Sequence, residues 1–419
     1  MSTLKVNKIR DTAGSADSIT LDPNGGAVIA GVTTVSTVKV GSGVTINSDG
    51  GVFTTGITTS SSVIVGGGVT ISESGIEASG IGITCANING NQISGRRNKI
   101  VNGAVRIAQR GTSHSPGGSS QAYYIDQFEH IATTGASFDA TVTQDSSVTM
   151  PDGFSKAYKV TPDATNTPTG GGNGMFRMKI EGQNCQDLAY GTSSAKQVTV
   201  SFYARSGTQN NGHQYTFQLR HFATDGTQRS INAPFTITYS FQRFIFTFTG
   251  DTAVDIIDSN GLGMELDWQL AAGPDDITSQ HTSWTTTNLF TCVTGQSNFL
   301  DSTSNAFYVT GVQLEVGSQA TAFEHLNFGE DLALCQRYFW SDPDDTSFGY
   351  YSTRYGNSGS FCVVSLPVSM RAQPTATGTR GDGGSLTSTT TARDRLQFYV
   401  SNDYTTYITQ TSVTATAEL

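Results

Sequence analysis

The sequence has few charged residues and few of the residues from which long helices are built. Asp, Glu, Lys and Arg together make up 14% of the 419 residues, against roughly 25% in ordinary soluble domains. Lys, Glu and Leu are sparse, so long amphipathic helices have little to form from. Gly, Ser, Thr and Asn take their place, and these residues suit turns and half-exposed sheet surfaces. The composition predicts an all-β protein.

Other deficits exclude classes of partner. The 24 Lys and Arg against 34 Asp and Glu give a net charge of −10, which disfavours nucleic-acid binding because that binding relies on clustered cations. We interpret the one tight basic cluster, Arg96, Arg97 and Lys99, as a solvated linker. No apolar run approaches the roughly 20 residues that cross a bilayer, and the N-terminus lacks the apolar stretch of a secretory signal. We expect no nucleic-acid partner, no membrane insertion and assembly in a cytoplasm.

Cysteines are few, odd in number and without CxxC spacing. This pattern predicts free thiols, mostly buried, in a protein assembled in a reducing compartment. The five are Cys85, Cys185, Cys292, Cys335 and Cys362.

An internal repeat is present near the N-terminus. Gly31–Gly50 (GVTTVSTVKVGSGVTINSDG) aligns with Gly56–Gly75 (GITTSSSVIVGGGVTISESG) at a period of 56 − 31 = 25 residues, and Gly80 begins a third, truncated copy. Each copy reads as two short strands joined by a glycine turn. Its apolar members are Val38, Val40, Val44 and Ile46 in the first copy and Val63, Val65, Val69 and Ile71 in the second.

One such unit has too little apolar surface to offset an ordering entropy of roughly 1–2 kcal/mol per residue. We therefore predict that three chains wind together over residues 31–95, forming a homotrimeric β-repeat shaft whose core is these eight residues. A disordered Gly/Ser/Thr linker is the alternative. Residues 1–30 read as a small β-segment that docks on a larger structure through Leu4, Val6 and Ile9.

From residue 96 to residue 330 the strand patterns lengthen and aromatic residues become frequent. Strands of about 8–10 residues separated by polar loops predict an antiparallel jelly-roll β-sandwich. In the last of them, Tyr308, Thr310, Val312, Leu314 and Val316 are predicted to share one side. The strand candidates are Gln197–Arg205, His213–Phe222, Phe241–Phe248, Gly261–Leu270 and Phe307–Val316.

Residues 331–419 are predicted to complete or cap the sandwich. One short helix is expected over Phe328–Phe339, with acids in its first turn, an arginine near its end and Leu332, Cys335 and Phe339 on one stripe. A glycine-rich hairpin tip is expected over Gly378–Ser385. Four strands are expected at Phe348–Tyr351, Phe361–Leu366, Leu396–Val400 and Thr406–Val413.

Eight stretches stand out as a set: Asn98–Ala104 (NKIVNGA), Gln109–Thr112 (QRGT), Tyr124–Phe128 (YIDQF), Phe307–Gly317 (FYVTGVQLEVG), Ala322–His325 (AFEH), Cys335–Phe339 (CQRYF), Pro367–Pro374 (PVSMRAQP) and Ala417–Leu419 (AEL). Together they resemble a domain common in tailed-bacteriophage fibre proteins. The opening Ser2–Val6 (STLKV) is also similar to the start of many fibre and structural proteins of cyanophage-like viruses. The resemblance is strong from residue 98 onward and loose before it.

The resemblance implies a homotrimeric tail or virion fibre subunit whose globular domain is similar to carbohydrate-binding jelly rolls. Its implied partners are other phage proteins at the N-terminus and host-surface polysaccharide or lipopolysaccharide, and its implied location is the virion, at the tail or neck. The family carries no catalytic residues to transfer. The chain departs from the family at Gln127 and Phe128, where arginine and tryptophan are more usual, which puts any role of that pair in doubt.

Motifs for catalysis or cofactors do not appear. The six histidines (His114, His130, His213, His221, His281 and His325) show no metal-ligand spacing, and no GxSxG or GxxxxGK[ST] motif is present. The acidic groups Asp275-Asp276, Asp342–Asp345 and Asp251/Asp255/Asp258 read as turns, with calcium at Asp342–Asp345 as the alternative. Arg380-Gly381-Asp382 reads as a hairpin tip. We expect no enzyme, no cofactor and no metal.

Sugar binding is the favoured chemistry, since sugar rings stack on exposed aromatic side chains that polar groups surround. Trp340, Tyr350, Tyr351 and Tyr355 are the candidates, although core or intersubunit packing is the leading reading for this group. Trp268 reads as core, and Trp284 as either. The predicted function is host attachment by a fibre. The alternatives are a purely structural neck or capsid fibre or decoration protein and, less favoured, a glycan-degrading tailspike.

Overall fold

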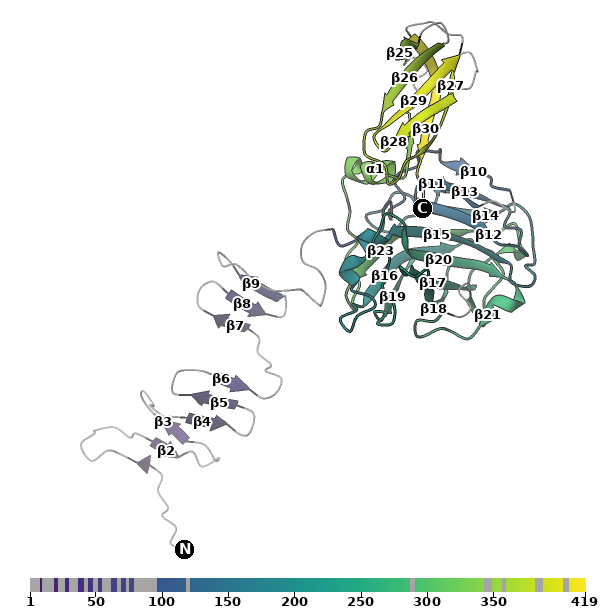
Figure 1. Ribbon diagram of the computed structural model, residues 1–419. Helices are drawn as coiled ribbons and strands as arrows, with labels where there is room; N and C mark the ends of the chain where they lie inside the picture. The colour runs from purple at the N-terminus through teal and green to yellow at the C-terminus, as the bar shows by residue number, and fades with distance from the viewer. Residues whose placement is uncertain are drawn as a thin grey trace. The chain divides into compact units, whose positions relative to one another are not determined.

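The computed structural model describes residues 96–117, 121–286, 291–342, 349–355, 359–380, 387–401 and 407–419, together with nine short strands between residues 8 and 78. The chain divides into two compact units, Met1–Cys85 and Ala86–Leu419 (Figure 1).

The N-terminal unit contains three-stranded antiparallel sheets. The first joins β1 (Lys8–Ile9), β2 (Ile19–Leu21) and β3 (Ala27–Ile29). The other two are β4 (Thr37–Val40), β5 (Val44–Asn47) and β6 (Val52–Thr54), and β7 (Ser62–Val65), β8 (Val69–Ser72) and β9 (Gly75–Ala78). Of the predicted attachment residues, Ile9 pairs with Ile19 in the first sheet, whereas Leu4 and Val6 lie outside the described residues.

The sequence repeat is also a repeat of backbone pairing. Val38 pairs with Ile46 and Val40 with Val44 in one sheet, and Val63 pairs with Ile71 and Val65 with Val69 in the next. Because residues of a strand alternate between faces, the four positions in each sheet share one face. The eight positions therefore occupy equivalent places in the two copies, while the trimeric shaft stays a prediction.

The predicted antiparallel jelly-roll sandwich is confirmed in the second unit. Sheet I has the order β10-β13-β14-β23-β16-β19 and sheet II the order β11-β12-β15-β20-β17-β18. From β14 to β17, successive strands switch sheet at every step, as a jelly roll requires. The strands of sheet I are β10 (Ser113–His114), β13 (Ala140–Asp145), β14 (Ala157–Pro162), β23 (Phe307–Val316), β16 (Val198–Ser206) and β19 (Gln242–Phe248). Those of sheet II are β11 (Gln121–Ile125), β12 (Phe128–Ala132), β15 (Asn173–Glu181), β20 (Leu262–Ala272), β17 (Gln214–Phe222) and β18 (Gln228–Thr236).

Short elements connect these strands. β21 (Ile277–Thr278) and β22 (Cys292–Val293) form a parallel pair. The 3-10 helices are η1 (Gly182–Asn184), η2 (Gln186–Leu188), η3 (Pro274–Asp276) and η4 (Phe299–Asp301).

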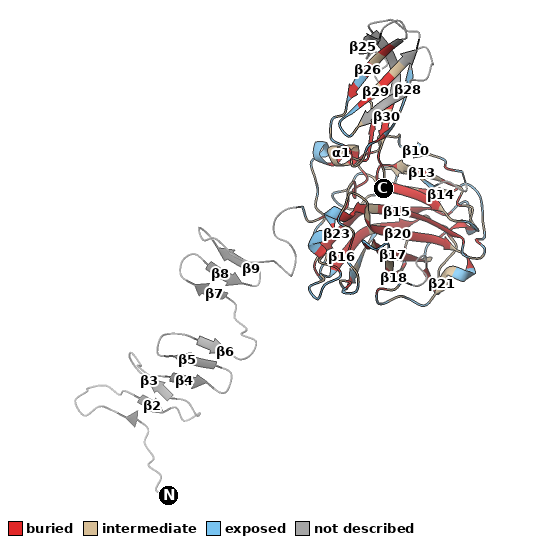
Figure 2. Ribbon diagram, viewed as in Figure 1, coloured by how far each residue is buried: buried red, intermediate tan, exposed pale blue. Residues whose placement is uncertain are grey.

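The core lies between the two sheets, where buried strands run through both layers (Figure 2). The predicted inner face of β16 (Val198, Val200, Phe202 and Ala204) is buried there, as are Tyr215, Phe217 and Leu219 of β17. Trp268 is fully buried, as predicted, and stacks on Phe176 with ring centres 4.9 Å apart.

The prediction that the alternate residues from Tyr308 to Val316 share one side of the last sandwich strand is wrong. Phe307 and Val309 face the core at one end of β23, and Val312 and Leu314 face it at the other. The inward parity changes at Gly311, which has φ +64° and lies in a β-bulge where the register with β16 shifts. Tyr308 consequently points away from the core and packs in a separate outer cluster with Ala157 and Ala306.

The C-terminal strands build sheets of their own, and among the described residues none joins the sandwich. They have the order β24-β30-β25-β26-β29-β28, with β27 on the other edge of β30. Their core contains Trp340, Cys362, Leu396, Phe398 and Val413. The elements are α1 (Phe328–Gln336), β24 (Phe339–Ser341), β25 (Gly349–Tyr355), β26 (Gly359–Ser365), β27 (Thr375–Arg380), β28 (Thr387–Ala392), β29 (Arg395–Ser401) and β30 (Tyr407–Thr416).

Two local predictions in this part are corrected. The helix ends at Gln336 and Phe339 begins β24, because Phe339 pairs with Thr416. Gly378–Arg380 belong to β27, which pairs with β30, so the predicted hairpin tip is partly strand; residues 381–386 lie outside the described residues. In the part of the chain that the structure describes, no helix is long or apolar enough to cross a membrane.

The stretches that carry the fibre-protein resemblance meet where the sandwich joins the C-terminal strands. Arg110 stacks over Phe339 at 3.6 Å from its ring centre and pairs with Glu418. Gln109 donates to Asp126 at 2.7 Å and to the Phe339 carbonyl at 2.8 Å. These stretches therefore fix the joint between two cores. Gln127 and Phe128 are structural as well, since Gln127 takes φ +71° in the β11–β12 turn and Phe128 is fully buried.

Candidate functional site

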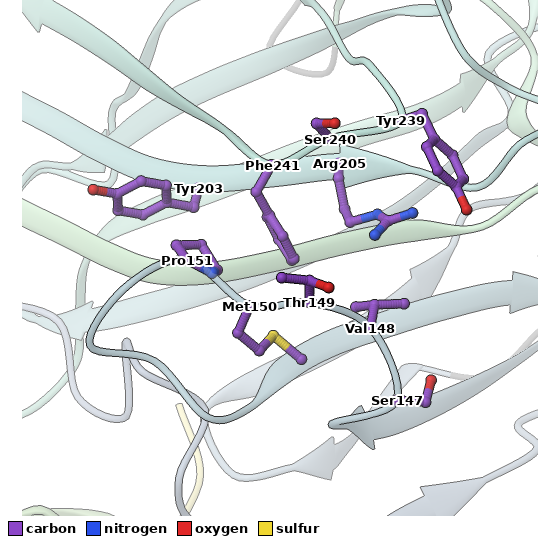
Figure 3. Close-up of a pocket in the computed structure, with 10 residues that line it drawn as sticks. All are labelled: Ser147, Val148, Thr149, Met150, Pro151, Tyr203, Arg205, Tyr239, Ser240 and Phe241. Carbon is purple, nitrogen blue, oxygen red and sulfur yellow. The ribbon is translucent and has the colours of Figure 1, made fainter.

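A pocket of about 560 Å³ lies on the outer face of sheet I. Three segments far apart in the sequence line it: Ser147–Pro151 between β13 and β14, Tyr203 and Arg205 on β16, and Tyr239–Phe241 between β18 and β19 (Figure 3). Tyr203 and Arg205 point outward because they alternate with the core residues Phe202 and Ala204. We call this the aromatic pocket. Its volume lies within the roughly 300–1,000 Å³ of small-ligand sites.

The bulge in β23 supports one side of the pocket. A Cβ at Gly311 would lie 2.7 Å from Cζ of Phe154 and 3.0 Å from Cδ2 of Tyr203. The rings of Phe154 and Tyr203 are 5.4 Å apart. The glycine therefore lets both rings pack directly on the backbone of β23, which fixes the position of Tyr203.

Arg205 is the central charged residue of the pocket. Its guanidinium carbon lies 4.5 Å from the ring centre of Tyr239, 5.2 Å from that of Tyr308 and 5.8 Å from that of Phe241. In Figure 3 the side chain points toward Tyr239. Arg205 is 7% exposed, whereas Tyr239 is 54% exposed. The pocket thus combines a buried cation with an aromatic ring that is open to solvent.

Free hydroxyl groups surround these rings. Among the described residues, the side-chain hydroxyls of Tyr203, Tyr239 and Thr149 have no hydrogen-bond partner. Ser147 is different, because both its backbone N–H and its hydroxyl donate to Asp145. None of the ten lining residues is Asp or Glu. The arrangement offers aromatic faces, hydroxyls and one guanidinium, which suits binding of a polar ring and provides no general acid or base pair.

The residues predicted for sugar binding lie elsewhere. Trp340, in β24, is 7% exposed and belongs to the core of the C-terminal strands, so its ring is not open for stacking and the core alternative holds for it. Tyr350, Tyr351 and Tyr355 are in β25, where Tyr350 pairs with Ile408 and Tyr351 with Tyr407. Their side chains lie outside the described part of the structure. Trp284 is 8% exposed, and its indole N–H donates to the Thr249 carbonyl at 2.7 Å.

Several of the predicted turn acids and histidines have structural partners. His221 Nε2 lies 2.8 Å from Asp251, which also pairs with Arg229, and burial lowers the pKa of His221. Asp276 accepts a hydrogen bond from Asn173. Asp342 is described, but Pro343–Asp345 are not. No group of three or more His, Cys, Asp or Glu in the described residues is placed to hold a metal ion.

A buried charge network on the outer face of sheet II was not predicted from the sequence. Glu265 and Asp267 of β20 lie between Arg177 of β15 and Arg220 of β17. Arg177 contacts Glu265 at 3.0 Å and Asp267 at 3.3 Å, and Arg220 pairs with both carboxylates. Burial, and then Asp267, raise the pKa of Glu265. Because each carboxylate is shared between two guanidinium groups, the network reads as structural.

The thiols behave as predicted where they are described. Cys362 is buried, and Cys185, Cys292 and Cys335 are free and buried. Burial raises the pKa of each of these three thiols, that of Cys185 to about 12. These thiols are therefore protonated small apolar side chains at neutral pH.

The sequence did hold one signal for the aromatic pocket. The residues of Gln197–Arg205 that are predicted to face outward are Thr199, Ser201, Tyr203 and Arg205. The first two are small and polar, whereas the last two are an aromatic residue and a cation. The other two segments are loops, and only the order of strands in the sheets brings them to the same place.

No protein-family model matches the sequence, and no curated protein matches it. Among solved structures, the enzymatically active domain of tailspike protein 4 from bacteriophage CBA120 matches with a TM-score of 0.28 and 10% identity, over 52% of this chain and 21% of that one. The family 11 carbohydrate-binding module of a Clostridium thermocellum cellulase matches with a TM-score of 0.26 and 10% identity, over 50% and 97%. The xylan-binding domain of Paenibacillus barcinonensis Xyn10C matches with a TM-score of 0.25 and 9% identity, over 50% and 94%. The chain thus spans about a fifth of the tailspike domain that it matches, and likenesses this weak assign it no ligand or activity.

Proposed function

We propose that the chain is a homotrimeric tail or virion fibre subunit of a tailed bacteriophage and binds host-surface glycans through the aromatic pocket. The observation that carries the glycan binding is an exposed Tyr239 beside Arg205, in a pocket that Tyr203 and Phe241 also line and that has free hydroxyl groups. Aromatic faces accept the apolar side of a sugar ring, and hydroxyls and guanidinium N–H groups bind its oxygens. The chain acts without catalysis, as a subunit of the virion.

Two sequence features support the fibre assignment. The resemblance to tailed-phage fibre proteins runs through the sandwich and the C-terminal strands. The repeated pairing of Val38, Val40, Val63 and Val65 gives each small N-terminal sheet an apolar face that is too small to be stable alone. Burying those faces between three chains is the arrangement we propose for the shaft. Three copies of a weak sugar site then bind one surface with higher avidity than a single site.

The test is binding of the full-length protein to host cells and to purified host-surface polysaccharide. Tyr239→Ala removes an exposed ring, so it leaves folding intact and lowers pocket affinity by about tenfold or more. Phe328→Ala is the matched control: Phe328 is 53% exposed and lies under Arg106 at 5.4 Å, as Tyr239 lies beside Arg205, but it is in α1, away from the pocket lining. Its removal leaves binding unchanged.

Three results contradict the proposal. Absence of binding to cells and polysaccharide by a folded trimer favours the purely structural fibre or decoration protein. Shortening of the polysaccharide chains during incubation favours a glycan-degrading tailspike. A folded monomer at working concentration removes the fibre assignment itself.

A further inference from the structure

Arg205 differs from the other buried arginines in how its charge is compensated. The buried arginines of the described residues are Arg177, Arg205 and Arg220. Arg177 and Arg220 each contact both Glu265 and Asp267. Arg205 forms no ion pair with any described residue, and its one hydrogen bond runs from Nε to the Ser206 carbonyl at 3.2 Å.

Among the described residues, the two terminal nitrogens of Arg205 therefore have no hydrogen-bond acceptor. A guanidinium carries five N–H groups, of which four are on these two nitrogens. The three aromatic rings around Arg205 compensate part of its charge, but they accept no ordinary hydrogen bond. The terminal nitrogens are not fully enclosed, so their unpaired N–H groups remain accessible from the pocket that Arg205 lines. An anionic ligand in the pocket would complete their hydrogen bonding.

No carboxylate lines the pocket. Two acids flank the lining segment Ser147–Pro151: Asp145, which is engaged by Ser147 and lies 3.7 Å from Lys159, and Asp152, which is exposed. Lys159 in turn lies 5.3 Å from the Tyr308 ring, and Arg243 lies 5.9 Å from the Tyr203 ring. The lining itself therefore carries the positive charge of Arg205 and no negative charge, in a chain whose net charge is −10.

We propose that the aromatic pocket recognises an acidic sugar, with the ring carboxylate of a uronic acid paired to the terminal nitrogens of Arg205. The planar fork of a guanidinium matches a carboxylate through two parallel hydrogen bonds. The exposed ring of Tyr239 lies next to that fork, so it stacks on the sugar whose carboxylate Arg205 holds. This inference rests on the proposed glycan binding and names its ligand class.

The experiment is calorimetric titration of the full-length protein with three carboxylated oligosaccharides. The first is made of galacturonate, the second of guluronate, and the third of glucuronate that alternates with a neutral sugar. Each is paired with its carboxyl-reduced, neutral counterpart, and a sulfated neutral oligosaccharide is the second comparison. We expect at least one acidic oligosaccharide to bind about tenfold or more tightly than its neutral form. The preference weakens as salt is raised, because the pairing is electrostatic.

Two variants separate recognition from a structural role of Arg205. Arg205→Met keeps the length and removes the charge, so the acidic preference is lost while the melting temperature stays the same or rises. Arg205→Lys keeps the charge without the fork, so it retains only part of the preference.

Each contrary result has a distinct meaning. Equal binding of acidic and neutral forms, or of the sulfated form and the best acid, overturns the acidic-sugar inference and leaves the glycan site. If Arg205→Met lowers the melting temperature and weakens the binding of acidic and neutral oligosaccharides equally, Arg205 has a purely structural role. That result also overturns the inference. If no oligosaccharide of the set binds, the inference is wrong; if Tyr239→Ala also leaves binding to host polysaccharide unchanged, the proposed glycan site is wrong as well.

Discussion

Arg337 and Glu181 are joined by two hydrogen bonds of 2.7 Å each, from Nε and Nη2 of the arginine to the two carboxylate oxygens. Glu181 ends β15 of the sandwich and is fully buried, whereas Arg337 follows α1. Tyr338 adds a third bond of 2.7 Å from its hydroxyl to the same carboxylate. This carboxylate therefore ties the sandwich to the segment that leads into the C-terminal strands.

Arg337→Met should destabilise this junction. It leaves the buried carboxylate of Glu181 without its cation, and we expect the free energy of unfolding to fall by about 2–3 kcal/mol, less than for a fully buried pair because the Arg337 side chain is 25% exposed. Denaturant unfolding measures the change. Lys99→Met is the control, since its partner Asp187 is 42% exposed and removal of a surface pair changes stability by less than about 1 kcal/mol. Equal effects of the two substitutions would argue against the junction role.

Gly311→Ala should affect both stability and the pocket. The methyl group would meet Phe154 and Tyr203 at a residue with φ +64°, so we expect a loss of about 2–3 kcal/mol and weaker glycan binding through displacement of Tyr203. Gly329→Ala is the control, because nothing lies within 4 Å of its added methyl group in α1. That change should leave stability unchanged or raise it by up to about 1 kcal/mol. A Gly311→Ala protein of normal stability would contradict the account of the bulge.

Stability should fall on acidification, and His130 should carry part of the effect. Burial lowers the pKa of His130 from 6.5 to about 4, and its Nε2 lies 2.8 Å from the Phe138 carbonyl. Between these two pH values the unfolded chain binds a proton that the folded protein does not, so folding stability decreases as the pH falls from 6.5 toward 4, by roughly 3 kcal/mol in total.

The comparison of wild type with His130→Asn isolates this contribution. Carboxyls with raised pKa values, such as Glu265, act in the opposite direction, but they are present in both proteins and cancel in the difference. Unfolding free energies measured from pH 7 to pH 4 should show a shallower dependence in the variant. Parallel pH profiles would mean that His130 takes up its proton in the folded protein.

The proposed shaft can be tested at one strand pair. Val40 pairs with Val44, and Thr45 pairs with Lys39 on the opposite face of the same sheet. Val40→Asp should dissociate the oligomer, because it places charges in a shared apolar core, whereas Thr45→Asp should leave it intact. Analytical ultracentrifugation gives the mass. A trimeric Val40→Asp protein would mean that the valines face solvent or that the second unit alone holds the assembly.

The sequence allowed the fold to be predicted where one strand's own pattern decides the outcome. In β16, alternate Val198, Val200 and Phe202 all face the core because no bulge interrupts them. The same reasoning failed in β23, because the β-bulge changes which alternate residues face the core. That change can be predicted only if Gly311 is recognised as a residue with left-handed backbone conformation. The sequence left Trp340 between core packing and sugar binding for a different reason: Trp340 pairs with Ala415 of β30, and no local pattern reveals a partner so distant in sequence.

The aromatic pocket could not be predicted for the same reason. Its residues come from a loop after β13, an outward face of β16 and a loop after β18, and each is unremarkable by itself. Arg205 was also hidden, because an arginine at the end of a strand is usually solvated. Its burial among Tyr239, Tyr308 and Phe241 depends on contacts between strands.

The backbone pairing in β4–β5 is repeated in β7–β8 with a displacement of 25 residues. One copy of the repeat can therefore be exchanged for the other. Deletion or insertion of a 25-residue segment keeps every later residue at the same position of the repeat. In the proposed fibre, recombination between copies therefore changes the length of the N-terminal part without disturbing the domain that follows. In the proposed fibre, the length of the shaft and the choice of ligand can therefore vary separately in related genes.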